Sequence, residues 1–142
     1  MPRFSVAEPT IQTERPITVL IAEDDELLRG LLARTLWEEG YRTLEARDGS
    51  VALRMAREAH PHLQLVITDV VMPNLSGHEL GQHLAAECPD IPIIYISAYP
   101  SGDLFRRDGP AGAMFLQKPF SIQDLQAMVR SAVRAKRVQG SA

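Results

Sequence analysis

The sequence of 142 residues predicts a single α/β domain in which five strands alternate with five helices around a doubly wound parallel sheet. Apolar runs without polar alternation recur along the chain, as expected for strands that are buried on both faces. Segments with apolar residues at helical spacing separate these runs. Four of the five runs are followed at once by a residue with acidic, basic or hydroxyl chemistry. Ligands collect at the carboxyl ends of such strands, so this pattern also predicts a site.

The five strands are expected over residues 17–22, 41–46, 63–68, 91–96 and 113–117. The helices are expected from Asp25 to about Gly40, over 49–59, over 77–87, near Leu104 and Phe105, and after the cap Ser121. In the first helix, the spacing of the leucines places Leu31 in the apolar stripe. The segment around Leu104 is rich in glycine and proline, so it is the least secure of the five helices.

The chain is expected to consist of a flexible leader (1–15), one domain (16–137) and a short tail (138–142), with no output domain. A net charge of −3 argues against a surface built for nucleic acid or an anionic membrane. No apolar run is long enough to span a membrane, and residues 1–16 lack the apolar core of a signal peptide, which predicts a cytoplasmic protein. Cys88 is the single cysteine, so no internal disulfide forms.

Carboxylate, hydroxyl and ammonium groups stand at the ends of four predicted strands. These residues are Glu23 and Asp24, Asp69, Ser97 and Lys118. Because parallel strands end at the same edge of a sheet, we expect these side chains to lie together. Each residue alone has an ordinary interpretation as a helix cap or a strand-end polar residue, but the matched positions favour one site.

Three carboxylates in one crevice repel each other and require a cation. Oxygen ligands with room for water and phosphate favour Mg²⁺, and Mg²⁺ with Lys118 would balance the charge of Glu23, Asp24 and Asp69. Such a site suits the transfer of a phosphoryl group to Asp69, with Ser97 binding a phosphoryl oxygen afterwards.

Four segments together resemble the receiver domain of bacterial two-component response regulators: VLIAEDD (19–25), ITDVVMP (67–73), ISA (96–98) and KPF (118–120). The resemblance covers about residues 17–137, and the run IYISAY (94–99) is similar to receivers attached to hybrid histidine kinases. It implies a flavodoxin-like fold with strand order 2-1-3-4-5. It also implies that Asp69 accepts its phosphoryl group from the phosphohistidine of a histidine kinase or phosphotransfer protein. The metal would be held by Glu23 or Asp24, Asp69 and the backbone carbonyl of Val71, and the peptide before Pro119 would be cis.

The resemblance further implies a switch in which Ser97 moves toward the phosphorylated aspartate and Phe115 fills the space that it leaves. In this family, side chains two residues after the aspartate and two after the hydroxyl residue influence hydrolysis. These are Val71 and Tyr99, whose bulk predicts a long-lived phosphorylated form.

Two alternatives remain. Asp69 could be the nucleophile of a phosphatase-like enzyme, although Val71 stands where such sites have a second acid. The chain could instead be a degenerate receiver that binds a protein without phosphorylation, although none of the required residues is missing. The sequence does not decide between a free-standing regulator and a piece of a hybrid kinase. It leaves the downstream partner unknown and allows a monomer or a weak homodimer.

Overall fold

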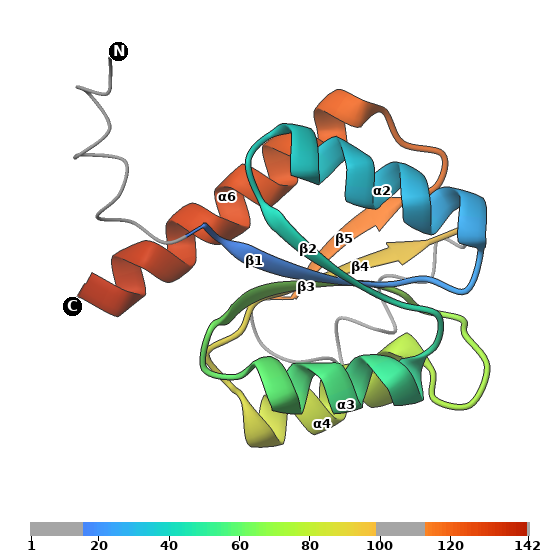
Figure 1. Cartoon of the computed structure of the whole chain (residues 1–142), viewed down its shortest axis with the longest axis horizontal. Helices are drawn as coiled ribbons and strands as arrows, with labels where there is room; N and C mark the ends of the chain where they lie inside the picture. Colours follow the sequence, from blue (N-terminus) through green and yellow to red (C-terminus); the bar gives the residue numbers. More distant parts are fainter. Residues whose placement is uncertain (1–15, 99–112, 142) are drawn as a thin grey trace, which may run out of the picture.

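The computed structural model describes residues 16–98 and 113–141, and its strands form one five-stranded parallel sheet (Figure 1). The strands are β1 (Thr18–Ala22), β2 (Arg42–Ala46), β3 (Leu63–Asp69), β4 (Ile93–Ser97) and β5 (Met114–Gln117). Their order in the sheet is β2-β1-β3-β4-β5, and every neighbouring pair is parallel. The predicted doubly wound α/β fold and its strand order are confirmed.

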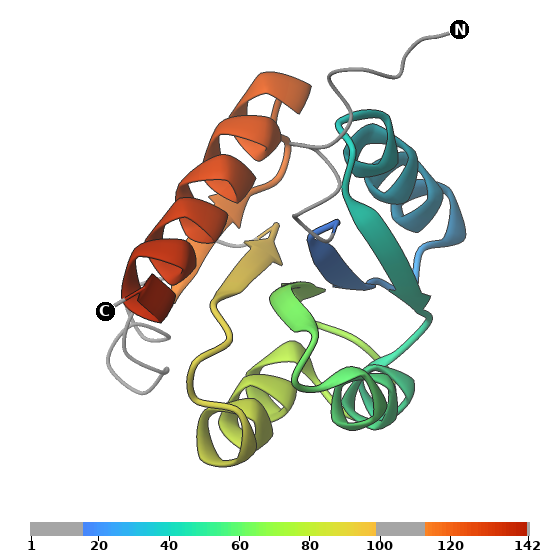
Figure 2. The ribbon, with the colours of Figure 1, turned by 60° about the vertical axis from the view of Figure 1, so that its left-hand side comes forward.

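Helices cover both faces of this sheet (Figure 1, Figure 2). They are α2 (Glu26–Glu38), α3 (Gly49–Ala59), α4 (Gly77–Glu87) and α6 (Ile122–Ser141). The helices α2 and α6 lie on one face, and α3 and α4 lie on the other. The neighbouring strands β1 and β3 therefore continue into helices on opposite faces, which opens a crevice outside their carboxyl ends.

The two central strands are buried on both sides. All five residues of β1 are buried, and so are six of the seven residues of β3. Leu20 and Val66 belong to the core beneath α3 and α4, whereas Ile21 and Ile67 belong to the core beneath α2 and α6. Burial of each such side chain contributes about 1.5–3 kcal/mol to folding, so the strand ends that carry the site are firmly held.

Local caps explain where the helices begin. The carboxylate of Asp25 accepts hydrogen bonds from the backbone N–H groups of Leu27 (3.0 Å) and Leu28 (3.3 Å), so Asp25 is the N-cap of α2. Ser76 and Glu79 form a reciprocal capping box at the start of α4. These caps fix helix starts close to the predicted ones, and the bounds of α3 and α4 are those predicted.

The expected place of Leu31 in the apolar stripe of α2 is wrong, because its side chain is 51% exposed. Residues spaced four apart, Leu28, Leu32 and Leu36, face the core instead. The buried face of α2 extends from this row toward Ala33, on the side away from Leu31, so Leu31 lies outside it beside the still more exposed Leu27.

Some predicted bounds differ from those of the structure, and some predictions fall outside the described residues. The strand β4 begins at Ile93 rather than 91, which agrees with the missing N–H donor of Pro92. The helix α6 runs to Ser141, into the segment expected as a tail. The leader (1–15), the helix expected near Leu104 and Phe105, and Tyr99 lie outside the described residues. Among the described helices, none is both long and apolar enough to cross a membrane.

Candidate functional site

The carboxyl ends of the strands bring the predicted acidic residues together. Glu23 and Asp24 follow β1 directly, and Asp69 is the last residue of the neighbouring strand β3. One carboxylate oxygen from each of the three lies within 4.8 Å of the others. The consecutive acidic residues therefore have different roles. Glu23 and Asp24 belong to the site, whereas Asp25 caps the helix α2.

Lys118 reaches this cluster from the end of β5. Its Nζ lies 3.2 Å from Oδ2 of Asp69 and 3.5 Å from Oε1 of Glu23. Burial alone would lower the pKa of Lys118, but the charges of Asp69 and Glu23 outweigh it and raise the pKa above its ordinary value. The ammonium group stays charged and ready to pair with anionic oxygens. The Lys118–Pro119 peptide is cis, as the resemblance implies.

Glu23 is the most strongly perturbed acid of the site. Its side chain is almost completely buried, and burial is the main reason why its pKa is raised to about 7. The charge of Asp69 acts in the same direction, whereas a hydrogen bond from the backbone N–H of Asp25 (3.0 Å) and the charge of Lys118 act against it. One ammonium group therefore does not compensate the carboxylates of this site.

The donor set fits a hard divalent cation. Among the described residues, the buried Oε1 of Glu23 has no hydrogen-bond partner, although Lys118 lies at ion-pair distance. Oxygen ligands from three carboxylates are the type that Mg²⁺ prefers, and the exposed Asp24 leaves one side of the cluster open.

Asp69 is held rigidly within this cluster. It is only 8% exposed, and one of its oxygens, Oδ1, lies 3.4 Å from the backbone N of Val71. The first residue of α4, Gly77, packs against the carbonyl of Asp69 so closely that an added Cβ would overlap the carbonyl oxygen. The requirement for close approach explains a glycine at this position.

The predicted switch residues occupy the two strands beyond Asp69. Ser97 ends β4, and its carbonyl accepts a hydrogen bond from the backbone N–H of Lys118 (2.8 Å). Phe115 lies on β5 and stacks on Tyr95, with ring centroids 5.4 Å apart and an interplanar angle of 23°. The sequence prediction missed Tyr95, which is fully buried. Tyr95 stands within an apolar run, and nothing in that run indicates that its ring contacts Phe115 on the neighbouring strand.

The sequence analysis also missed the tertiary role of Asp48, which it interpreted only as part of a turn or cap. Asp48 does cap α3, because Oδ1 accepts a hydrogen bond from the N–H of Val51 (2.8 Å). Its second oxygen, Oδ2, accepts a hydrogen bond from Nδ2 of Asn74 (2.9 Å), in the loop that follows Asp69. These two residues are 26 positions apart, so only the fold brings them together.

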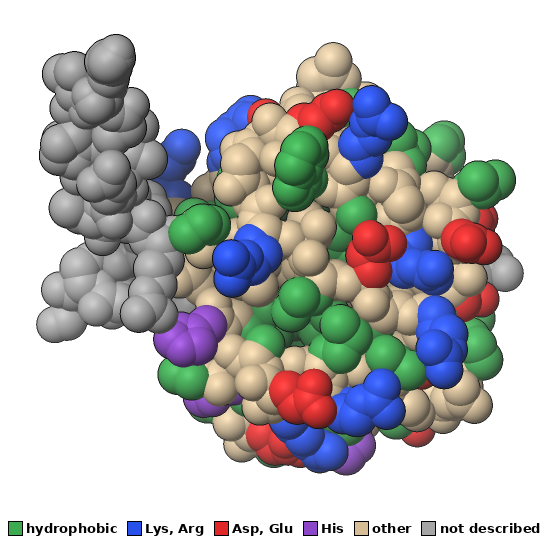
Figure 3. Space-filling view, in the orientation of Figure 1, with side chains coloured by type: hydrophobic (Ala, Val, Ile, Leu, Met, Phe, Trp, Pro, Cys, Tyr) green, Lys and Arg blue, Asp and Glu red, His purple; other side chains and the backbone are tan. Residues whose placement is uncertain are grey.

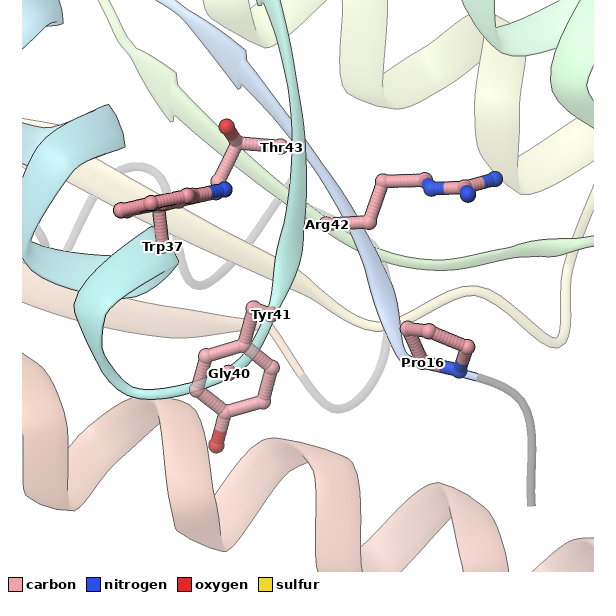
Figure 4. A pocket seen from close by; sticks show the side chains of 6 residues that line it. All are labelled: Pro16, Trp37, Gly40, Tyr41, Arg42 and Thr43. Atoms are coloured by element: carbon pink, nitrogen blue, oxygen red, sulfur yellow. The ribbon is translucent and has the colours of Figure 1, made fainter. Parts of the chain in front are cut away.

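A surface hollow of about 350 Å³ lies at the opposite end of the sheet, where β1 and β2 begin (Figure 4). It is lined by Pro16, Trp37, Gly40, Tyr41, Arg42 and Thr43. None of these lining residues carries a carboxylate, and the strands separate them from Asp69. The hollow is therefore not part of the acidic site.

Comparison with known proteins agrees with this architecture. A family model described as the response regulator receiver domain matches residues 19–130. The chain is 43% identical over 120 residues to the transcriptional regulatory protein PdtaR of Mycobacterium tuberculosis, a match that covers 83% of this chain and 57% of that protein. It is 39% identical over 115 residues to the sensor kinase CckA of Brucella abortus, covering 80% of this chain and 12% of that protein. The chain thus spans less than two thirds of either relative.

Solved structures give the same result. The receiver domain of the hybrid histidine kinase CckA is 33% identical with a TM-score of 0.71, and the match covers 82% of this chain and 98% of that one. A response regulator receiver domain protein from Clostridium thermocellum is 25% identical with a TM-score of 0.80, covering 87% and 98% of the two chains.

The fold and the site define a doubly wound α/β protein with an acidic centre at a topological switch point. The chain belongs to the response regulator receiver domain family of two-component signalling. This is a family of receivers rather than of classical enzymes.

Proposed function

We propose that this domain accepts a phosphoryl group on Asp69 from the phosphohistidine of a histidine kinase or a phosphotransfer protein. The observation that carries the proposal is that Asp69 lies in one cluster with the ammonium group of Lys118 and the carboxylates of Glu23 and Asp24. In the transfer, a carboxylate oxygen of Asp69 attacks phosphorus. The P–O bond forms as the P–N bond to the imidazole breaks, and the bonding electron pair stays on the imidazole nitrogen.

The residues that would hold Mg²⁺ are Glu23, Asp24, Asp69 and the backbone carbonyl of Val71. When bound, Mg²⁺ supplies positive charge near the phosphoryl oxygens. Lys118 contributes a second positive charge, already directed at Asp69 from 3.2 Å. The rigid ends of β1 and β3 keep these groups in place before the phosphoryl group arrives, so little reorganisation is needed.

Phosphorylation would then be read out through Ser97 and Phe115. Ser97 would donate its hydroxyl to a phosphoryl oxygen, and Phe115 would shift on the ring of Tyr95. Lacking a hydroxyl, Phe115 can report its position only through packing. The added charge on Asp69 would thus shift the surface around β5 from one conformation to another. This change would alter how well a downstream partner binds there.

Exposed apolar side chains around the site support a protein as phosphodonor. Leu27, Val71 and Ile122 are 86%, 63% and 37% exposed, and each lies within four residues of Asp24, Asp69 or Lys118. An apolar rim around a charged centre suits docking of another protein surface. The chain would act in the cytoplasm as a monomer or weak homodimer.

Nucleic acid and membranes are not proposed as partners. The net charge is −3, and Figure 3 shows basic and acidic side chains interspersed over the face in view. A surface that binds phosphate backbones or anionic lipid would instead collect basic residues.

The lifetime of the phosphorylated form would depend on Val71 and Tyr99. Hydrolysis needs a water molecule in line with phosphorus, and the bulk of an aliphatic and an aromatic side chain would shield the phosphorus from it. We expect the label to persist well beyond seconds in the isolated domain, which a time course of intact mass after removal of the donor would measure. Complete loss of label within seconds would contradict this expectation.

Incubation with acetyl phosphate and Mg²⁺, followed by intact-mass measurement, tests the proposal. The wild-type chain should gain one phosphoryl group, and Asp69→Asn should gain none. If neither folded protein gains mass, the domain would be an unphosphorylated binding module instead. Steady release of phosphate from an added phosphate ester would favour the phosphatase-like alternative, which the place of Val71 disfavours.

A further inference from the structure

A buried carboxylate outside the acidic site connects two elements of the fold. Asp48 is only 6% exposed, and its two oxygens have separate partners. One oxygen caps α3 through Val51, and the other accepts the hydrogen bond from Asn74. The hydrogen bond from Val51 lowers the pKa of Asp48, and the bond from Asn74 acts in the same direction, so Asp48 is ionised at neutral pH. Charge-assisted hydrogen bonds of this type are stronger than neutral ones.

Asn74 occupies a special position in the loop between β3 and α4. Its φ is 71°, in the left-handed region that asparagine adopts more readily than most residues. The next residue, Leu75, has its carbonyl oxygen directly against Gly49, where an added Cβ would overlap it. The side chain of Asn74 and the backbone of Leu75 are thus both fixed to the first turn of α3, by Asp48 and Gly49.

The other end of this loop is fixed to the sheet. The N–H of Val70 donates to the carbonyl of Ile96 (3.0 Å), and the carbonyl of Val70 accepts from Gly77 (2.8 Å). Between Val70 and Asn74 only three residues remain, of which Val71 is solvent-exposed and Met72 is buried. A span this short between two fixed points leaves the peptide groups of Val71 little freedom to turn.

We propose that Asp48 and Asn74 are positioning residues for the acidic site, because their hydrogen bond holds the loop so that the backbone carbonyl of Val71 faces the cation. The inference rests on the proposed function, in which Val71 supplies a backbone oxygen to Mg²⁺. Groups that orient a metal ligand affect metal affinity although they do not touch the metal. The pair would therefore govern how tightly the domain binds Mg²⁺, and through it the rate of phosphorylation at limiting Mg²⁺.

Mg²⁺ affinity of the full chain, measured by titration calorimetry without phosphodonor, tests the inference. In Asn74→Gly, the backbone conformation is retained at no steric cost while the hydrogen bond is lost. We expect about tenfold weaker Mg²⁺ binding, at the low end of the effects known for groups that orient metal ligands. Phosphorylation by acetyl phosphate should slow at low Mg²⁺ and recover when Mg²⁺ is saturating.

Exchanging the side chains of Asp48 and Asn74 keeps the total charge, and it distinguishes loss of their hydrogen bond from a general disturbance of the loop. Asn74→Asp places two carboxylates against each other and should also weaken Mg²⁺ binding, in spite of its extra negative charge. The double variant Asp48→Asn, Asn74→Asp restores one amide facing one carboxylate and keeps an oxygen to cap Val51. Its Mg²⁺ affinity should return to within about twofold of wild type, since paired residues couple when they are in contact.

Glu87→Gln is the matched control. It breaks the ion pair of Glu87 with Arg57, which joins the same two helices, α3 and α4, at the ends away from the site. It should leave Mg²⁺ affinity unchanged. If Asn74→Gly behaves like this control, or if the double variant fails to restore affinity, the positioning role is wrong. If the wild-type chain itself neither binds Mg²⁺ nor gains a phosphoryl group, the proposed function fails and the inference fails with it.

Discussion

The acidic site and the far ends of α3 and α4 contain the same chemical groups in different surroundings. At the site, Glu23 is buried beside a second acid, and its pKa rises to about 7 even though Lys118 lies 3.5 Å away. At the far ends, Glu87 is paired with Arg57 at 2.6 Å, and that hydrogen bond lowers the pKa of Glu87. Burial and a neighbouring like charge, rather than the presence of a cationic partner, distinguish the two regions.

This difference has a functional meaning. In the surface pair of Glu87 and Arg57, the two charges compensate each other and contact solvent, so the pair has little tendency to bind a ligand. The buried cluster holds carboxylates at a strand edge whose charge Lys118 does not fully compensate, so it is suited to bind a divalent cation. Perturbed carboxylates in a crevice are therefore the better guide to the function of this protein.

The largest expected effect comes from removing the ammonium group of Lys118 from the acidic site. Lys118→Ala should slow phosphorylation by acetyl phosphate by about a hundredfold or more, the range found when one group that stabilises a developing charge is lost. Mg²⁺ binding should persist, because Glu23, Asp24 and Asp69 are kept. Rates of mass gain at saturating Mg²⁺ measure the effect. An unchanged rate would show that the two regions do not differ as we describe.

A smaller effect is expected in the pH dependence of stability. The folded-state pKa of Glu23, about 7, lies above its ordinary value of 4.5, so the folded chain holds this proton more tightly than the unfolded chain does. Without metal, stability should therefore fall as the pH rises from about 4.5 to about 7. Unfolding midpoints of wild type and Glu23→Gln in the presence of a chelator should diverge over this range. Parallel curves would argue against the burial of an uncompensated charge.

The smallest effect is expected at the surface pair. Glu87→Gln removes a carboxylate of a partly exposed surface ion pair, so the unfolding midpoint and the phosphorylation rate should both remain close to wild type. Thermal unfolding at low and high salt provides the measurement. A large loss of stability would mean that this pair is coupled to the core of the domain.

The sequence alone predicted the parts of the protein that depend on local pattern. Asp69 and Lys118 could be placed at strand ends because each follows a largely apolar run, and parallel strands end at one edge. The start of α3 could be predicted because Asp48 is a good cap, and the structure shows Ser76 in the same role for α4. The family resemblance supplied the strand order and the cis peptide before Pro119.

Contacts between distant segments could not be predicted in this way. The hydrogen bond between Asp48 and Asn74 and the ring stacking of Tyr95 on Phe115 depend on how helices and strands are placed in space. The exposure of Leu31 was missed for a related reason, because helical spacing shows which residues share a side of a helix but not which side the sheet will cover. Tertiary packing decided each of these features.

The central claim is that the acidic edge makes Asp69 a phosphoacceptor with the help of a divalent cation. Peptide mapping by mass spectrometry after acetyl phosphate treatment, with Mg²⁺ or with a chelator, tests it most directly. We predict one phosphoryl group, on the peptide that contains Asp69, and only when Mg²⁺ is present. A phosphoryl group on another residue, or equal labelling with the chelator, would contradict the account.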